Sequence, residues 1–372
     1  MLAELDRQPH VRAVLGPALE PGGVASHAYL FYGPAGAGKR AAARAMAAEL
    51  LAAGAGDPDG ARARTRSGAH PDLTWVVPSG AHEILVSDID EPVVAAASKT
   101  PFEASCRVFV IERVDELGDE AANRMLKTLE EPPRFVHMIL LTDRLTEVLP
   151  TISSRCQLVR FDAPSLDQIA AEAEQLGVDP EHARACARLA LGDLDAARML
   201  AGPQGQELRA AGARFARSAL SGASAGERPW VEMLAAVRKE GERVREELET
   251  QVSRELELYP RKERKRVENE WSERIRRVRR RTETRALDLA LQVVALWYAD
   301  LAALGWGAAD VVRNSDRLAE LQSERSVDPA RLLAAVESVE EVRQRFQLNV
   351  SEDLACEALA YRLERQLGGG AS

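Results

Sequence analysis

The chain has 372 residues, a length that predicts two or three domains, and a formal net charge of -9. A charge of this sign argues against attraction of the whole molecule to nucleic acid, although local patches can differ. The composition is 46% hydrophobic, 29% charged and 5% aromatic, which is typical of a helix-rich globular protein.

No targeting, membrane or disulfide signal is present. The N-terminus has charges and a proline where a signal peptide needs an apolar core, and we find no apolar run of membrane-spanning length. The four cysteines lie far apart without a CxxC pair, so they predict neither a zinc module nor a disulfide framework. We therefore expect reduced thiols in a cytoplasmic protein with no membrane partner.

Residues 1–162 alternate short apolar strands with helices, which predicts an α/β domain with a parallel sheet covered on both faces. A polar, glycine-rich loop is expected at residues 54–72. The expected strands are residues 28–32, 73–77, 107–113 and 136–143, with a last strand after a helix that begins at 149; the other expected helices are residues 39–54, 86–101 and 119–133.

After residue 162 the strand pattern stops, and two helical domains are expected. Residues 163–205 form three short helices with N-cap candidates at Ser165, Asp179 and Asp193, which predicts a small helical lid. Residues 206–368 are helical throughout and are expected to form an all-α domain.

Residues 237–284 have the pattern of an antiparallel helical hairpin inserted in this domain. Apolar residues recur on one face of two arms that Pro260 separates, as in a short coiled coil. The first arm is mostly acidic, and the second contains "RIRRVRRR". Neutralisation of one arm by the other on a solvated surface is the favoured interpretation, and DNA binding is the alternative.

The stretch "GPAGAGKR", residues 33–40, lies between an apolar strand and a helix, which is the setting of a phosphate-binding loop. Gly33, Gly36 and Gly38 let backbone N–H groups point at phosphate oxygens. Lys39 would neutralise the outer phosphates, and the helix N-terminus adds its dipole. The alternative is a glycine-rich turn with an exposed lysine.

Two substitutions remove the groups that hydrolysis needs. Arg40 stands where Ser or Thr would hold Mg²⁺, and a guanidinium repels a cation. The strand "RVFVIER" ends in Glu112 and Arg113, where two acids are needed, and arginine cannot act as a general base. Asp115 and Glu116 are expected to cap the following helix. The sequence therefore predicts no ATP hydrolysis.

Three further strings follow the loop in order: "NRMLKTLEEPP" at 123–133, "ILLTD" at 139–143 and "TISSRC" at 151–156. With the loop, they resemble the clamp-loader branch of the AAA+ proteins, within bacterial DNA polymerase III. The resemblance covers residues 8 to about 200. Beyond that it depends on helical content, which implies a collar domain, and on "VVRNSDR" (311–317), which is similar to part of a collar helix.

Two kinds of clamp-loader subunit share these motifs, the gamma/tau ATPase motor and the delta-prime subunit. Arg40, Arg113 and Asp195 (in "GDLDAA", where the motor has an arginine) all indicate the delta-prime type, which generally lacks ATPase activity. The resemblance implies gamma/tau and delta subunits as partners, and indirectly the sliding clamp and primer-template DNA. An active ATPase of the same family, and a sensor that binds ATP or ADP without hydrolysis, remain alternatives.

The resemblance also assigns a role to Arg155 in "SRC", that of an arginine finger that reaches into the ATP site of a neighbouring subunit. The alternative is an arginine that caps a helix C-terminus. Cys156 is expected to be a packing residue. Lys127 and the acidic pair at 130–131 are either plain surface charges or charges that face a neighbour.

No cofactor is expected to be required. Many relatives carry four zinc-binding cysteines in the interval that here contains "GDPDGARARTRSG", without a cysteine. His70 alone cannot hold a structural zinc, which needs about four ligands. A metal-free loop is therefore expected.

Overall fold

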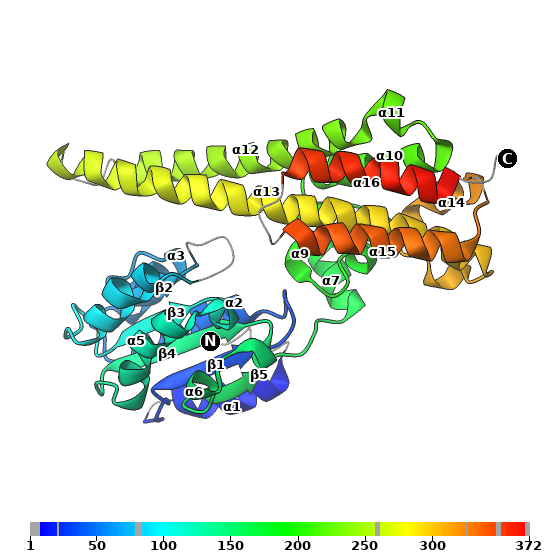
Figure 1. Ribbon diagram of the computed structural model, residues 1–372. Helices are drawn as coiled ribbons and strands as arrows, with labels where there is room; N and C mark the ends of the chain where they lie inside the picture. The colour runs from blue at the N-terminus through cyan, green and yellow to red at the C-terminus, as the bar shows by residue number, and fades with distance from the viewer. Residues whose placement is uncertain are drawn as a thin grey trace. The chain divides into compact units, whose positions relative to one another are not determined.

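The computed structural model describes residues 8–20, 22–78, 84–256, 261–324, 326–346 and 351–368. The chain forms two compact units, Met1–Pro164 and Ser165–Ser372, and each is described by itself (Figure 1). The domain limits expected at residues 162 and 205 stay predictions.

The first unit is built on a parallel sheet with the strand order β2-β3-β4-β1-β5. All four neighbouring pairs are parallel, as the alternation of strands and helices predicts. The strands are β1 (Ala28–Tyr32), β2 (Leu73–Val76), β3 (Arg107–Ile111), β4 (Val136–Thr142) and β5 (Gln157–Arg160).

Helices cover both faces of this sheet (Figure 1). Successive residues of β1 point to opposite faces, so Leu30 joins one hydrophobic cluster and Phe31 the other. The α-helices are α1 (Pro9–Leu19), α2 (Lys39–Ala52), α3 (Pro58–Ser67), α4 (Val86–Ile89), α5 (Asp119–Glu130) and α6 (Pro150–Ser153); η2 (Asp90–Ala95) is a π-helix, and η3 (Val114–Glu116) and η4 (Leu145–Glu147) are 3-10 helices.

The prediction of a loop throughout residues 54–72 is wrong, because α3 lies inside it. The Asp57 carboxylate accepts a hydrogen bond from the Gly60 backbone N–H at 3.0 Å, and Pro58 occupies the first helical position. Gly68 ends the helix with a φ of 80°. An N-cap, a proline at the start and a glycine at the end are ordinary helix signals, and they outweigh the polar composition.

The second unit is entirely helical over its described residues and has one hydrophobic core. Its first three helices are capped by Ser165, Asp179 and Asp193, which confirms these three N-cap predictions. The helices are α7 (Leu166–Glu174), α8 (Pro180–Leu189), α9 (Leu194–Ala201), α10 (Gly205–Ser221), α11 (Ser224–Glu227), α12 (Pro229–Leu256), α13 (Arg261–Gly305), η5 (Ala309–Val311), η6 (Ser315–Arg317), α14 (Leu318–Ser323), α15 (Pro329–Arg345) and α16 (Glu352–Gly368).

The charged hairpin is confirmed as the distal part of α12 and α13. Figure 1 shows these two helices side by side, extending past the other helices of the unit as a two-helix arm. Val252 and Ile275 are buried in the arm, as the apolar stripes predict. The turn at Pro260 lies outside the described residues.

Within α13, the segment Trp271–Gly305 is long and apolar enough to cross a membrane by length and composition, contrary to the expectation from the sequence. However, 72% of its apolar window is buried inside the structure. Burial of this kind is what the central helix of a helical core shows, since such a helix is apolar on most sides.

The expectation of a helix at residues 311–317 is also wrong. The segment begins at the last residue of the 3-10 helix η5 and ends with the 3-10 helix η6. Between them the fully buried Asp300 carboxylate accepts hydrogen bonds from the backbone N–H groups of Arg313 and Asn314, both at 2.9 Å. A side chain that binds these N–H groups competes with their use in an α-helix.

Asp316, in the same segment, binds a fully buried arginine. Its two carboxylate oxygens accept from the Arg209 guanidinium at 2.9 and 2.8 Å, and His182 lies 3.1 Å away. Burial raises the pKa of Asp316, but the hydrogen bonds from His182 and Arg209 outweigh burial and hold it well below its usual range. The pair connects α10 to the 311–317 segment.

Substitution of this carboxylate is expected to destabilise the protein strongly. Asp316→Asn leaves the Arg209 charge buried without a counter-charge, which typically costs about 3–5 kcal/mol. Urea unfolding monitored by circular dichroism measures the change. Asp310→Asn, at an exposed position in η5 just before this segment, is the control and should cost less than about 0.5 kcal/mol. A cost below about 1 kcal/mol for Asp316→Asn would contradict the assigned role.

Candidate functional site

The loop between β1 and α2 has the shape of a phosphate-binding loop. Gly33, Gly36 and Gly38 have φ values of 145°, 73° and 89°, in the region that favours glycine. A Cβ on Gly33 would lie 2.1 Å from the backbone oxygen of Phe161, so no larger residue fits there. The chain then enters α2 at Lys39, which places a helix N-terminus at the loop.

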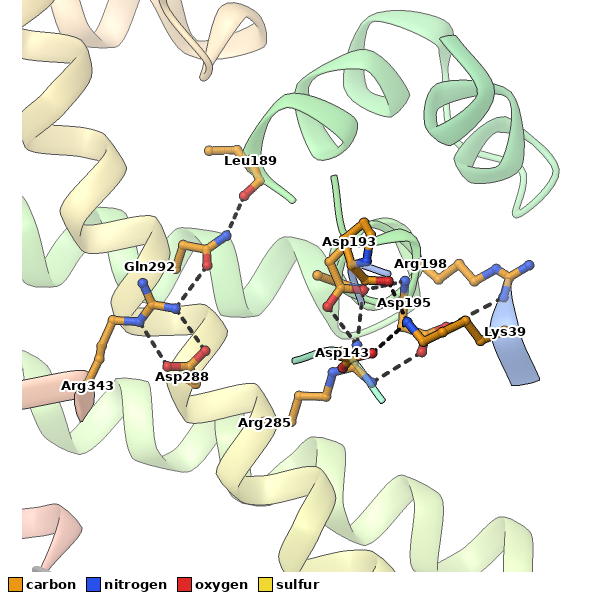
Figure 2. A network of polar contacts seen from close by, with 12 residues as sticks. Lys39, Asp143, Leu189, Asp193, Asp195, Arg198, Arg285, Asp288, Gln292 and Arg343 are labelled. Atoms are coloured by element: carbon orange, nitrogen blue, oxygen red, sulfur yellow. Dashed lines mark hydrogen bonds and ion pairs between the residues drawn. The ribbon is translucent and has the colours of Figure 1, made fainter. Parts of the chain in front are cut away.

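Lys39 is buried, and its ammonium group lies against three oxygens of the protein itself. Its Nζ donates to the backbone oxygens of Gly33 and Pro34 at 2.6 and 2.7 Å. It also lies 2.6 Å from an oxygen of Asp143, which follows β4 (Figure 2). Two N–H groups of the ammonium thus donate to the loop carbonyls, and the Asp143 carboxylate balances its charge. The predicted alternative of an exposed lysine is therefore wrong, since the Lys39 side chain is only 7% exposed.

Arg40 and Glu112, which stand at two positions important for metal binding, bind each other. The Arg40 Nε and Nη2 atoms both lie 2.8 Å from Glu112 Oε1. The indole N–H of Trp75 donates to the same oxygen at 2.7 Å, and the Glu112 side chain is only 5% exposed. The Arg40 guanidinium thus binds the carboxylate that would otherwise organise Mg²⁺. These residues therefore do not fit a magnesium site.

The acids after β3 have structural partners instead of the expected capping role. Asp115 accepts a hydrogen bond from the Thr142 hydroxyl at 2.7 Å and pairs with Arg144 at 2.9 Å. Glu116 pairs with Arg113, whose backbone is left-handed with a φ of 56°. Gly118 is the N-cap of α5, so the capping expectation is wrong. Two arginines nearby attract these carboxylates more strongly than a helix end does.

Arg155 follows α6 and is partly exposed. Its Nη2 lies 2.6 Å from Glu130 Oε1, and its Nη1 donates to the Thr151 backbone oxygen at 2.9 Å. The guanidinium side chain is 35% exposed and its partner 48%, so water reaches the pair. The next residue, Cys156, lies against a hydrophobic cluster of the first unit, and burial raises the pKa of its thiol to about 12. A thiol with this pKa is a packing residue rather than a nucleophile, as expected.

Asp195 lies in the second unit, where it forms part of a charged cluster (Figure 2). The Arg285 guanidinium lies 3.4 Å from Asp195 and 3.1 Å from Asp193, the N-cap of α9. Arg198, one turn further along α9, lies 3.6 Å from Asp195. Asp195 thus holds α9 to α13, a structural task that the sequence alone did not indicate.

His70 lies at a buried position between α3 and β2 and has polar partners. Its Nδ1 accepts from the Asp72 backbone N–H at 3.2 Å, its Nε2 lies 3.3 Å from Glu103, and burial lowers its pKa. Within the described ranges, no three His, Cys, Asp or Glu side chains gather as metal ligands. The metal-free loop stays a prediction.

Several charges of the hairpin are paired over its described residues, between the arms, within an arm or with another helix. Arg279 on α13 lies 2.7 Å from Glu242 on α12 and 2.9 Å from Glu283. Arg280 lies 2.8 Å from Glu352 of α16. These contacts favour the interpretation of two arms that neutralise each other, because basic groups already paired with carboxylates offer less charge to a phosphate backbone.

Asp143 and Trp75 belong to the site although the sequence did not single them out. Asp143 ends the string "ILLTD" after β4, and β4 is the neighbour of β1 in the sheet. The carboxyl ends of parallel strands meet at one edge, so strand order is the signal that would have found Asp143. Nothing in the sequence marks Trp75 as the partner of Glu112.

The parallel sheet, the glycine loop and the "SRC" string together make the first unit similar to a AAA+ module of the clamp-loader branch. Comparison with known proteins shows which clamp-loader subunits the chain is similar to. Residues 8–165 match the family model described as "DNA polymerase III, delta subunit". This match, with the delta-prime relatives below, confirms the resemblance to delta-prime clamp-loader subunits.

Among known proteins, subunit delta' of DNA polymerase III from Bacillus subtilis is 35% identical over 186 residues, which are 49% of this chain and 56% of the relative. Subunit delta' from Pseudomonas aeruginosa is 38% identical over 136 residues, 35% of this chain and 42% of the relative. Subunit gamma/tau from Mycobacterium tuberculosis is 32% identical over 163 residues, 41% of this chain and 27% of the relative. The chain thus spans about half the length of the delta-prime relatives it matches.

The pair between Arg40 and Glu112 gives a testable stability effect. Arg40→Ala removes a hydrogen bond and the counter-charge from a buried carboxylate, which we expect to cost about 1–3 kcal/mol in urea unfolding. Arg160→Ala is the matched control, because Arg160 pairs with Asp162 in an exposed position and should cost less than about 1 kcal/mol. Equal costs for the two variants would contradict the structural importance of the Arg40 pair.

Proposed function

We propose that this protein is a non-hydrolysing, delta-prime-like subunit of a cytoplasmic clamp loader. In this proposal it assembles with gamma/tau ATPase subunits and a delta subunit, and the complex places a sliding clamp on primed DNA. The observation that carries the proposal is the Arg40–Glu112 ion pair, which puts a fixed cation at the acidic position where a motor subunit would organise its metal ion.

Hydrolysis by this chain is disfavoured for two further reasons. Arg113, at the position of the general base, keeps its proton at neutral pH and is itself paired with Glu116. Asp115, the nearest other acid, already binds Thr142 and Arg144. The acids that follow β3 are thus engaged by arginines, whereas activation of water needs a carboxylate that is directed at the water molecule.

Arg155 is proposed to act in trans on the nucleotide of a neighbouring subunit. The guanidinium is partly exposed, and its pair with Glu130 is open to water, so the side chain can leave that pair at little cost. Arginine is suited to this task because its planar, always charged group binds phosphoryl oxygens in a bidentate manner. Phosphate oxygens would replace the Glu130 oxygen as its partner.

Two alternatives differ in what they predict for nucleotides. An active ATPase of the same family would turn over ATP by itself, and the similarity to gamma/tau subunits is what favours it. A nucleotide sensor would bind ATP or ADP without hydrolysis, and the intact glycine conformations of the loop favour that function.

Steady-state assays of the purified chain distinguish the first alternative. We expect no ATP hydrolysis above background, and Lys39→Ala should leave the measured rate unchanged. Turnover that Lys39→Ala abolishes would overturn the proposal in favour of a motor subunit, because the loop lysine is part of the phosphate cradle of such enzymes.

Substitution of Arg155 tests the trans-acting role in a reconstituted clamp loader. Arg155→Ala should assemble normally but lower hydrolysis at the neighbouring site by at least about 10³-fold, the usual contribution of an arginine finger. Single-turnover hydrolysis with the complex in excess over ATP measures this site. Arg155→Lys, which keeps the charge without the planar group, should rescue only part of the loss.

Arg124→Ala is the matched control, because Arg124 is also an exposed arginine of the first unit with an exposed carboxylate partner, Asp90 at 3.7 Å. Its complex should hydrolyse ATP at the unsubstituted rate. Urea unfolding should show a cost below about 1 kcal/mol for both alanine variants, since both pairs are exposed. Unchanged single-turnover hydrolysis by the Arg155→Ala complex would contradict the trans-acting role.

A further inference from the structure

The two cationic side chains at the phosphate-binding loop already have partners within the protein. Lys39 donates hydrogen bonds to two loop carbonyls at 2.6 and 2.7 Å and forms an ion pair with Asp143 at 2.6 Å. Arg40 directs two donors at Glu112. A phosphate that enters the loop therefore meets backbone N–H groups and a helix dipole, but it must compete with carboxylates for the charged side chains.

We propose that Asp143 is an internal competitor that keeps phosphate out of the loop by holding Lys39. The Gly33 and Pro34 carbonyls cannot be what excludes phosphate electrostatically, because they carry no net charge. The Asp143 carboxylate carries a full negative charge and lies within hydrogen-bond distance of Nζ, where a phosphate oxygen would have to lie. It thus both pairs with the Lys39 charge and repels an incoming anion.

The exposure of Asp143 determines which member of the ion pair can move away. Its side chain is 49% exposed, whereas the Lys39 side chain is 7% exposed, so the carboxylate is the mobile partner of the pair on solvation grounds. Displacement of the carboxylate into water leaves Lys39 in place, aligned by the two loop carbonyls. Apparent affinity for phosphate is then lowered by the fraction of molecules in which Lys39 remains bound to Asp143.

The ligand class that this loop would accept is a nucleoside diphosphate or pyrophosphate taken up without a metal ion. The Arg40 guanidinium lies at Glu112, so the place of a magnesium ion is filled by a fixed cation. Binding should therefore be indifferent to Mg²⁺, unlike binding at an ordinary phosphate loop. This inference concerns the chain's own loop and does not depend on whether Arg155 acts on a neighbour.

The test is a calorimetric titration of the purified full chain with ADP, and separately with inorganic pyrophosphate, in Mg²⁺ or in EDTA. The unsubstituted chain should show no saturation up to about 1 mM, which corresponds to a binding free energy weaker than about -4 kcal/mol. Asp143→Asn, which keeps size and shape but removes the charge, should bind at least about tenfold more tightly, equally with and without Mg²⁺. Adding Lys39→Ala to Asp143→Asn should abolish the gain.

Glu147→Gln is the matched control, because it removes the same charge from the next turn of the same segment, and Glu147 has the same 49% exposure but pairs with Arg144. It should leave binding at the unsubstituted level. Restoring a hydroxyl as well, in Arg40→Ser with Asp143→Asn, should make binding tighter in Mg²⁺ than in EDTA. Circular dichroism checks that each variant is folded.

Three results would overturn the proposal. The first is equal affinity of the unsubstituted chain and Asp143→Asn, whether both bind or neither does. The second is an equal increase in affinity in Glu147→Gln. The third is an increase in affinity in Asp143→Asn that persists when Lys39→Ala is added. A failure here leaves neighbour hydrolysis by the Arg155 variants as a separate measurement, so the two proposals can fail independently.

Discussion

The parallel pairing of β1 with β4, and of β4 with β3, is the constraint on which the site depends. Parallel strands end at one edge of a sheet, so the loop after β1 and the segments after β3 and β4 are brought together whatever their side chains are. In a nucleotide-hydrolysing protein this edge collects phosphate, metal and water. Here it collects two cations, Lys39 and Arg40, and two carboxylates, Asp143 and Glu112, which pair with one another.

Much of this arrangement was predictable from the sequence. Strand and helix periodicity, with buried strands rich in Val, Ile and Leu, gives the α/β class, and the caps at Ser165, Asp179 and Asp193 locate three helices. The prediction that magnesium chemistry is lost follows from residue types alone, because no conformation makes Arg40 a metal ligand or Arg113 a base.

The predictions that were wrong concern places where one side chain changes the backbone conformation, or where several partners compete for one side chain. Asp57 caps a helix in a segment whose composition favours a loop, and Asp300 binds N–H groups that a helix would have used. Asp115 takes Thr142 and Arg144 as partners rather than a helix end. Such choices depend on which groups the tertiary fold brings near, and periodicity within the sequence contains no information on that.

A fixed guanidinium and a bound magnesium ion differ in a way that bears on the proposed role. A metal ion arrives with its nucleotide and leaves with the product, so the charge balance at a motor site changes during each cycle. Arg40 is part of the chain, so the charge that pairs with Glu112 at this edge of the sheet does not arrive or leave with a nucleotide. A subunit with such an edge has no reason to change shape when ATP is hydrolysed elsewhere. In the proposed role of a stationary subunit this independence would be an advantage, and the partly exposed Arg155 would be the group that contributes to another subunit's reaction.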